Sequence, residues 1–312
     1  MNHENKKLPL ILDIKGNSLD DGPGIRSVVF FKGCPLSCLW CHNPESQKPG
    51  PEIAFDATVC VDCGACRTLC PEQALSKTNP FYVDRNRCTL CFLCTSACPS
   101  GALEPMGKPM TVGKILDLIL PDKPFFDVSG GGVTLSGGEA TMHMDFVSEL
   151  ARELKKEGIH ILLETCGRFE LSRFLDRLYP YVDTIYFDLK LMDSKAHQRY
   201  CGQPNEGILQ NFRILAQSMA GDGKTLLPRT PLIPGITDTE ENIAAIASFL
   251  NSLGIKHGAL LPYNPLWQDK LHKMGLEDPF KNHPGLVGFS GKEVLERCRK
   301  IWNNAGISCA DR

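Results

Sequence analysis

The residues of this chain that could do chemistry are above all its cysteines. There are 15 among 312 residues, and eleven of them lie between Cys34 and Cys98 in C-x-x-C and C-x-x-x-C steps. Thiols this close in sequence are placed to bind one metal centre, whereas disulfide frameworks are typical of small secreted chains. We therefore expect metal centres in the first third of the chain. The remaining cysteines are scattered, and most are predicted to be small buried apolar residues: Cys166, Cys201, Cys298 and Cys309.

The first group, Cys34-Pro-Leu-Ser-Cys38-Leu-Trp-Cys41, follows the apolar residues 27–31, which predict a buried strand. Three thiolates at this spacing can hold three irons of a [4Fe–4S] cluster and leave the fourth iron free for another ligand. A structural zinc site needs four protein ligands, which His42 would complete as a Cys3His set. We favour the cluster, because adjacent Cys41 and His42 would strain a shared tetrahedral site.

This C-x-x-x-C-x-x-C spacing, with the aromatic Trp40 before its last cysteine, resembles the radical S-adenosylmethionine (SAM) superfamily. The resemblance implies that the cluster on Cys34, Cys38 and Cys41 is catalytic and that its open iron binds SAM through the amino and carboxylate groups. An electron from the cluster then cleaves SAM to methionine and a 5′-deoxyadenosyl radical, which abstracts hydrogen.

Further residues of the expected SAM pocket follow later strands. The glycines of Gly137-Gly138-Glu139 let the backbone approach a ligand, and the carboxylate can accept from an ammonium group. The motif resembles the turn that recognises the methionine part of SAM, with Ala140 where many members have Pro. The charges of Asp188-Leu-Lys190 share one strand face, as a pocket pair or as an ordinary surface ion pair. The resemblance assigns to SAM and its cluster Trp40, Cys41, His42, Gly137, Gly138, Glu139, Glu164, Asp188, Leu189, Lys190, Arg229 and Asn264.

Three segments indicate which branch of the superfamily the chain resembles. They are Asp21-Gly-Pro-Gly-Ile-Arg26, Phe30-Phe-Lys-Gly-Cys-Pro-Leu and Gly130-Gly-Gly-Val-Thr-Leu-Ser-Gly-Gly-Glu139. Together they resemble the glycyl-radical-enzyme activating enzymes, relatives of pyruvate formate-lyase activase, along about residues 8–306. Such enzymes abstract hydrogen from the α-carbon of one glycine in a large partner. The resemblance implies a glycyl radical enzyme as partner and flavodoxin or ferredoxin as electron donor.

Three pocket residues are carried over from that resemblance individually. Glu164 stands where activases commonly have Asp near a monovalent-cation site, so a monovalent cation is a further expected ligand. Arg229 is a candidate contact to the SAM carboxylate. Asn264 stands where the family often has His, and its amide can bind adenosine or ribose. A structural turn at Asn264-Pro265 is the alternative.

Residues 60–75 and 88–103 are near copies of one unit, 28 residues apart. Each reads C-x-x-C-x-x-C-x-x-x-C-P, the bacterial ferredoxin signature, in which the fourth cysteine ligates the other cluster. We therefore expect one [4Fe–4S] cluster on Cys60, Cys63, Cys66 and Cys98, and a second on Cys88, Cys91, Cys94 and Cys70. Zinc ribbons use C-x-x-C pairs and do not match this run. An electron relay is the favoured role of the insert, and a docking platform for the partner is the alternative.

The elements that must position these groups alternate after residue 111. Strands are predicted at 27–31, 132–136, 159–164, 184–189, 225–229 and 259–262, and helices at 144–156, 171–178, 195–200, 207–219, after Thr239, and at 292–304. Six strands joined by helical crossovers predict a parallel sheet, too few for the closed barrel of about eight strands. We predict an α/β fold, an incomplete (β/α)6 radical SAM barrel of residues 1–50 and 108–312, with an inserted bacterial-ferredoxin-like domain at 51–107.

Composition sets the remaining expectations. The formal net charge of −2 excludes the strongly basic balance of a general nucleic-acid binder. No apolar run approaches the roughly 20 residues of a membrane helix, and residues 1–7 lack a secretory apolar stretch. We expect a cytoplasmic protein with neither nucleic acid nor a membrane as partner. Two other functions stay open: a radical SAM enzyme for a small molecule or peptide, and an iron–sulfur electron-transfer or binding protein.

Overall fold

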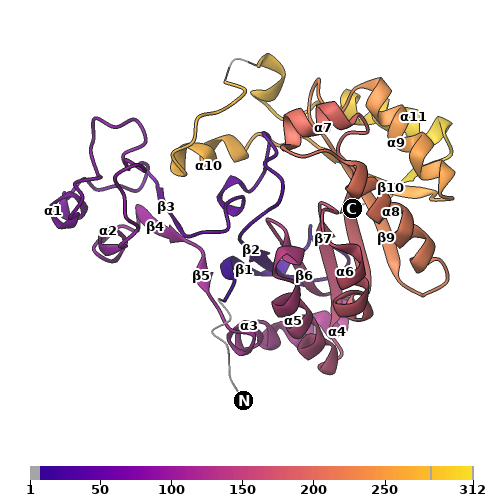
Figure 1. Ribbon diagram of the computed structural model, residues 1–312, viewed down its shortest axis with the longest axis horizontal. Helices are drawn as coiled ribbons and strands as arrows, with labels where there is room; N and C mark the ends of the chain where they lie inside the picture. Colours follow the sequence, from indigo (N-terminus) through magenta and orange to yellow (C-terminus); the bar gives the residue numbers. More distant parts are fainter. Residues whose placement is uncertain (1–7, 282, 311–312) are drawn as a thin grey trace.

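The computed structural model describes residues 8–281 and 283–310, and its main element is one mixed sheet (Figure 1). The N-terminal segment considered for a secretory signal, residues 1–7, lies outside the described residues. The strands are β1 (Leu10–Ser18), β2 (Arg26–Phe31), β3 (Glu52–Phe55), β4 (Leu103–Met106), β5 (Lys108–Pro109), β6 (Gly132–Gly137), β7 (His160–Thr165), β8 (Thr184–Asp188), β9 (Thr225–Leu232), β10 (His257–Pro262) and β11 (Ser308–Cys309). The helices are α1 (Ala65–Leu69), α2 (Leu93–Ser96), α3 (Val112–Ile119), α4 (Lys123–Ser129), α5 (Met144–Lys156), α6 (Leu171–Arg177), α7 (Ser194–Cys201), α8 (Glu206–Met219), α9 (Glu240–Ser252), α10 (Trp267–Lys273) and α11 (Lys292–Asn304).

The strand order confirms the predicted parallel sheet. It runs β11-β10-β9-β8-β7-β6-β2-β1-β5, and the six predicted strands, β2 and β6 to β10, are adjacent and parallel. Their carboxyl ends therefore meet along one edge. β1 adds to β2 in the antiparallel direction, and β5 pairs with β1. Because the order ends at β5 and β11 without joining them, the sheet is open, as an incomplete barrel requires.

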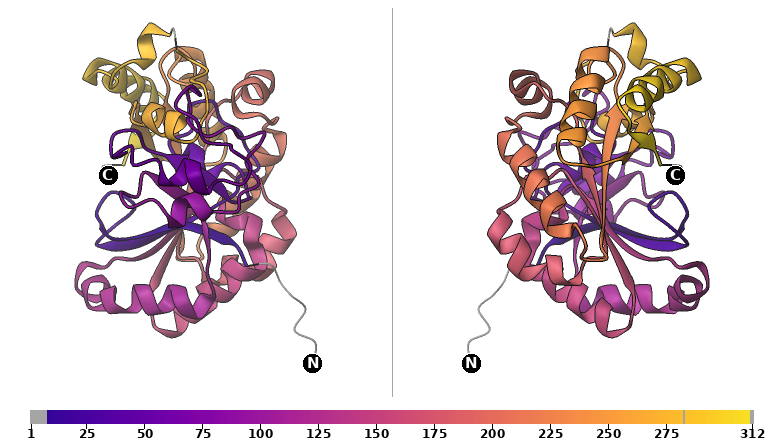
Figure 2. Two further views of the ribbon diagram at one scale, coloured as in Figure 1. Left: turned by 90° about the vertical axis from the view of Figure 1, so that its left-hand side faces the viewer. Right: turned by 90° about the vertical axis from the view of Figure 1, so that its right-hand side faces the viewer.

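Burial on both faces explains why the central strands read as apolar runs. Val133 and Leu135 in β6 are fully buried, and so are Val147 and Leu154 on the inner face of α5. The apolar positions of α5 recur at helical spacing, so they form one stripe against the sheet. Thr239 caps α9, where its hydroxyl accepts a backbone hydrogen bond at 3.3 Å. In the side views, α3 to α5 lie at one end and α10 and α11 at the other (Figure 2).

The segment between β3 and β4 forms a separate unit beside the sheet (Figure 1). β3 and β4 pair antiparallel at its base, and α1 and α2 each belong to one copy of the cysteine repeat. The unit has its own core, which includes Ile53, Leu75 and Leu103 and the stacked rings of Phe55 and Tyr82, whose centroids are 4.0 Å apart. We call the segment from β3 to β4, residues 52–106, the insert.

Two groups of contacts hold the insert against the rest of the molecule. Lys32, which is fully buried at the end of β2, forms an ion pair with Glu52 of β3 at 2.8 Å. On the other side, Lys273 in α10 pairs with Asp56 at 2.6 Å. The insert is therefore anchored both at its own base and through a helix that is distant in sequence.

Several elements had not been predicted. β1 extends beyond the apolar residues 8–14 at the start of the chain's described part. Its residues are only partly buried, because the strand lies near the edge of the sheet. α3, α4 and α10 are short helices between the predicted elements. Among the helices of the described residues, none combines the length and apolarity that crossing a bilayer demands.

Candidate functional site

Cys34, Cys38 and Cys41 lie in the loop directly after β2, at the carboxyl edge of the parallel strands. We call this segment, residues 34–41, the triad loop. Two of its backbone N–H groups donate at 2.9 Å to the carbonyls of the last two residues of α7. Trp40 is buried, and its ring centroid lies 6.1 Å from that of Tyr200. The end of α7 therefore holds the loop in place.

The thiols of the triad loop fit an iron–sulfur cluster. Burial and the neighbouring Cys38 raise the pKa of Cys41 to about 12. Thiols crowded in this way lose their protons when a positively charged group binds, and a metal cluster is such a group. In the described part of the chain, no three His, Cys, Asp or Glu side chains surround one point as a single ion requires. The exposed position of His42 weighs against the Cys3His zinc site.

Two cysteines outside the motif lie against it. The thiol of Cys166 contacts that of Cys34, and the thiol of Cys201 contacts that of Cys38. Both are buried, as predicted for the scattered cysteines, but they belong to the site. The hydrogen bond from Cys166 lowers the pKa of Cys34. The position of Cys166, two residues after Glu164, could have signalled its place, whereas nothing in the sequence marks Cys201.

The glycine turn after β6 fits closely onto the triad loop. A Cβ at Gly138 would lie 2.2 Å from the carbonyl oxygen of Gly33, and Gly137 has a φ of +107°. The N–H of Glu139 donates to the same Gly33 carbonyl at 2.7 Å. Both glycines therefore have a packing reason, because any side chain would push the turn away from the cysteines.

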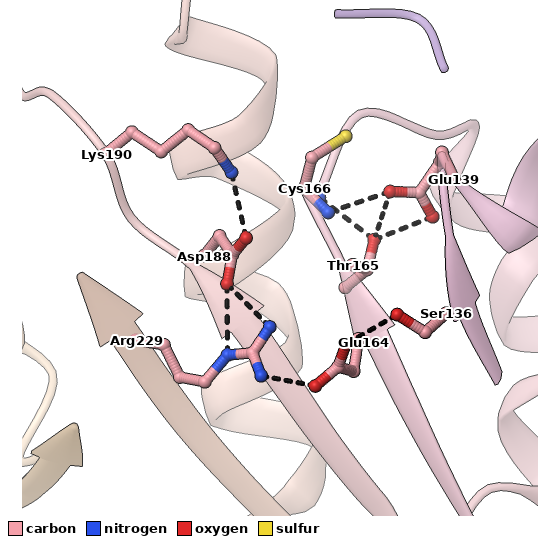
Figure 3. A network of polar contacts seen from close by, with 9 residues as sticks. Ser136, Glu139, Glu164, Thr165, Cys166, Asp188, Lys190 and Arg229 are labelled. Carbon is pink, nitrogen blue, oxygen red and sulfur yellow. Dashed lines mark hydrogen bonds and ion pairs between the residues drawn. The ribbon is translucent and has the colours of Figure 1, made fainter. Parts of the chain in front are cut away.

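Glu139 itself faces protein donors (Figure 3). Its carboxylate is fully buried and accepts from the Thr141 hydroxyl at 2.7 Å, the Thr165 hydroxyl at 3.0 Å and the Cys166 N–H at 2.7 Å. In this arrangement it ties the turn after β6 to the turn after β7. The expected contact with the SAM ammonium stays a prediction, and in this structure buried donors of the protein surround both oxygens.

A charge network crosses the ends of three neighbouring strands (Figure 3). The Arg229 guanidinium on β9 contacts Glu164 on β7 and donates to Asp188 on β8 at 3.0 Å. Lys190 donates to the other Asp188 oxygen at 2.9 Å, and Ser136 donates to Glu164 at 2.6 Å. The Asp188–Lys190 pair is mostly shielded from solvent, so it is not an ordinary surface ion pair.

Burial and charge act against each other in this network. Burial lowers the pKa of Arg229, but the carboxylates of Glu164 and Asp188 outweigh it and hold the pKa above its usual value. Burial raises the pKa of Asp188, and the cations Lys190 and Arg229 lower it further than burial raises it. Arg229 and Asp188 are therefore charged at neutral pH. The carboxylates are neutralised by side chains, so the residues around Glu164 do not fit the monovalent cation expected there.

The remaining pocket residues of the prediction lie in different settings. Leu189 is buried in the main core. The Asn264 side-chain oxygen accepts from the N–H of Leu266 at 3.0 Å, which is the turn role considered as its alternative. Lys270 of α10 donates to the His42 carbonyl at 3.1 Å and so lies beside the triad loop.

The eight cysteines of the repeats line two pockets, as the crossed pairing requires. One pocket is lined by Cys60, Cys63, Cys66 and Cys98, and the other is lined by Cys70, Cys88, Cys91 and Cys94. In both repeats the chain adopts positive φ at matching places, Asp62 and Gly64 in one, Leu90 and Phe92 in the other. Each repeat thus wraps around its pocket with the same backbone path.

Known protein families match most of the chain. A model described as the radical SAM superfamily matches residues 85–247. A 4Fe-4S dicluster domain model matches residues 59–102, which lie within the insert, and a 4Fe-4S single cluster domain model matches residues 20–78, which contain the triad loop.

Individual relatives agree with these families. The isethionate sulfite-lyase activating enzyme of Desulfovibrio desulfuricans is 39% identical over 282 residues, 88% of this chain and 89% of that protein. The trans-4-hydroxy-L-proline dehydratase activating enzyme of Clostridioides difficile is 37% identical over 305 residues, 96% of this chain and 98% of that protein. A solved radical SAM methyltransferase from Sphaerobacter thermophilus shares the fold, with a TM-score of 0.55 and 15% identity over 98% of this chain and 77% of that one. The chain therefore belongs to the radical SAM family, among the glycyl-radical-enzyme activating enzymes, and binds SAM and iron–sulfur clusters.

Proposed function

We propose that this chain installs a radical on one glycine of a large partner enzyme, by abstracting hydrogen from the α-carbon of that glycine. The observation that carries the proposal is the triad loop, three crowded thiols at the carboxyl edge of the sheet beside a charged pocket. When bound and reduced, the triad cluster supplies the electron that cleaves SAM to methionine and a 5′-deoxyadenosyl radical. The two relatives above are named as activators of other enzymes, which supports a protein as the substrate.

The residues around the triad loop have distinct parts in this proposal. Cys34, Cys38 and Cys41 hold the catalytic cluster. Among the described residues, the hydrogen bonds of Arg229 use three of its five N–H groups, so the others can orient the SAM carboxylate. Lys190 adds positive charge between Asp188 and the thiols. The glycine turn and Glu139 position the triad loop and the turn after β7.

We further propose three [4Fe–4S] clusters, one on the triad loop and two in the insert. The two four-cysteine pockets support the two insert clusters. The separate core and the β3–β4 pair support a division into a barrel of residues 1–50 and 108–312 and a ferredoxin-like insert of residues 51–107.

The insert is proposed to relay electrons from a flavodoxin or ferredoxin to the triad cluster. Cys63 and Cys91, one ligand of each insert cluster, are exposed, so an external donor can approach both. The α10 helix joins the insert to the triad loop, because Lys273 pairs with Asp56 while Lys270 contacts Asn43. Exposed apolar side chains on the insert, Val61, Leu69 and Leu93, favour docking of a protein there, so partner docking is the second candidate role.

The partner is proposed to be a glycyl radical enzyme that removes a substituent from its own substrate. The two relatives differ in this respect: one is named for a sulfite-lyase and the other for a dehydratase. Their identities to this chain, 39% and 37%, are too similar to select one class.

The test uses the anaerobically reconstituted full chain with dithionite and SAM. We expect 5′-deoxyadenosine by chromatography and, with the purified partner, a glycyl doublet by EPR. Isethionate sulfite-lyase, trans-4-hydroxy-L-proline dehydratase and the glycyl radical enzyme of the source organism would be compared as partners. A radical found only on a small metabolite would favour the small-molecule enzyme instead. If no 5′-deoxyadenosine formed at all, the result would favour the iron–sulfur electron-transfer protein.

A further inference from the structure

Glu164 and Asp188 lie at the ends of adjacent parallel strands, where two carboxylates would repel each other. Asp188 on β8 is the register partner of Arg229 on β9, and Glu164 lies one strand further, on β7. The Arg229 side chain reaches across β8 and contacts both acids. A guanidinium therefore occupies the space between the two carboxylates.

Each of the four oxygens of these carboxylates has a protein donor. Glu164 Oε1 contacts Arg229 Nη1, and Glu164 Oε2 accepts from Ser136 at 2.6 Å. Asp188 Oδ1 accepts from Arg229 Nε at 3.1 Å and Nη2 at 3.0 Å, and Asp188 Oδ2 accepts from Lys190 at 2.9 Å. A metal cation here would have to displace at least one of these donors.

The charges of the network also balance. Two carboxylates face one guanidinium and one ammonium, and the side chains are at most 22% exposed. If a cation displaced Arg229, the guanidinium would be left mostly buried without its acceptors, which is unfavourable. The longer side chain of Glu164, compared with Asp, shortens the gap that Arg229 must span.

We propose that Arg229 is a built-in counter-ion that stands in place of a monovalent metal cation, so that this chain binds SAM without Na⁺ or K⁺. The part of the inference that concerns SAM binding rests on the proposed function. The inference also makes a prediction about cation binding that does not involve SAM.

The first experiment measures SAM affinity by equilibrium dialysis of the reconstituted full chain. Tetramethylammonium is the only monovalent cation in one buffer, and K⁺ or Na⁺ replaces it at equal ionic strength in the others. We expect the dissociation constant of the wild-type chain to stay within about twofold, whereas a co-binding cation would tighten it by about fivefold or more. Arg229→Met should bind SAM more weakly in tetramethylammonium, and K⁺ should restore part of the affinity. Arg177→Met, at an exposed arginine, is the matched control and should behave as wild type.

The second experiment uses Tl⁺ as a K⁺ probe without SAM, followed by thallium NMR. We expect no saturable binding by the wild-type chain and a new site in Arg229→Met, which leaves the two carboxylates without the guanidinium. Saturable Tl⁺ binding by the wild type that is lost in Glu164→Gln would overturn the inference, and so would a fivefold K⁺ effect on its SAM affinity. If the wild type failed to bind SAM in every buffer, the proposed function would fail, and the Tl⁺ result would still decide the counter-ion.

Discussion

The triad loop and the insert enclose their cysteines in different ways. In the triad loop, three thiols lie between the glycine turn and the end of α7, and two further thiols, Cys166 and Cys201, contact them. In the insert, each pocket has four cysteines, of which one is exposed (Cys63 or Cys91), one is buried (Cys66 or Cys94) and two are half-buried. One region is embedded in the sheet edge, and the other presents one cysteine of each pocket to solvent.

This difference separates two tasks of one kind of cofactor. A cluster with four cysteine ligands has no open iron, so it can pass electrons but cannot bind SAM. The triad loop supplies only three ligands from its motif and adds the charged side chains of Asp188, Lys190 and Arg229 nearby. The triad loop is therefore suited to bond cleavage, and the insert, with one exposed cysteine at each pocket, is suited to electron exchange with another protein.

Removing the triad ligands should have the largest effect. The chain is expected to hold about twelve irons, and Cys34→Ala, Cys38→Ala and Cys41→Ala together should leave about eight, because the insert keeps its own ligands. SAM cleavage should be abolished, since no open iron remains. Iron analysis and chromatography of 5′-deoxyadenosine measure both results. Cys309→Ala is the control and should retain every iron, whereas 5′-deoxyadenosine from the triple variant would show that the catalytic cluster lies elsewhere.

Removing one insert cluster should have an effect that depends on the reductant. Cys91→Ala with Cys94→Ala should cost about four irons and leave the triad loop intact. If the insert is an electron relay, this variant should lose turnover with flavodoxin or ferredoxin as reductant. Dithionite should restore part of the turnover, because it reaches the catalytic cluster directly. Rates of SAM cleavage with each reductant measure this difference. Equal loss with both reductants, together with weaker binding of the partner, would reject the relay and favour docking.

The equivalent pair in the other repeat is the matched variant. Cys63→Ala with Cys66→Ala removes ligands at the same positions of the first repeat. If both clusters lie on one electron path, the two double variants should lose activity with the protein reductant to the same extent. A defect in only one of them would identify the cluster at which electrons enter.

The fold could be predicted where the sequence pattern is strong. The six parallel strands and the helices α5 and α11 were expected within a few residues, because buried strands form apolar runs and amphipathic helices repeat at a fixed spacing. β1 and α10 were not predicted, since half-exposed strands and short polar helices carry a weaker pattern. Yet α10 is one of the elements that link the insert to the triad loop, through Lys270 and Lys273.

The site could be predicted only as far as short motifs extend. The cysteine spacing of the two repeats indicated which cysteines share a pocket, because that spacing matches the ferredoxin signature. The contact between Arg229 and Glu164 joins residues 65 positions apart across three strands, and only the sheet register brings them together. The same holds for Cys201, which reaches Cys38 through the position of α7.

The junction between the two regions provides a test of intermediate size. Lys32 is fully buried and pairs with Glu52, whereas Lys48 pairs with the same carboxylate from an exposed position. Lys32→Met should lower the free energy of unfolding by about 3 kcal/mol, because breaking a buried pair leaves its charge poorly compensated. Lys48→Met is the matched control and should cost less than about 1 kcal/mol. Urea unfolding measures both values, and equal losses would mean that Lys32 does not join the regions.

The smallest effect is expected within the insert, where the two repeats share one backbone path with different side chains. Gly64 has a φ of +78°, and Phe92 holds the matching position of the other repeat at +58°. A Cβ at Gly64 would meet only the flexible end of Arg67, at 3.3 Å, so Gly64→Ala should fit without displacing the backbone. Its cost should be about 1 kcal/mol, the strain of a left-handed residue. Gly113→Ala in α3, where a Cβ would meet nothing, is the control and should be neutral or stabilising. Iron release to a chelator should quicken slightly in Gly64→Ala alone. A loss of the whole cluster would mean that the first repeat, unlike the second, cannot tolerate a side chain on this path.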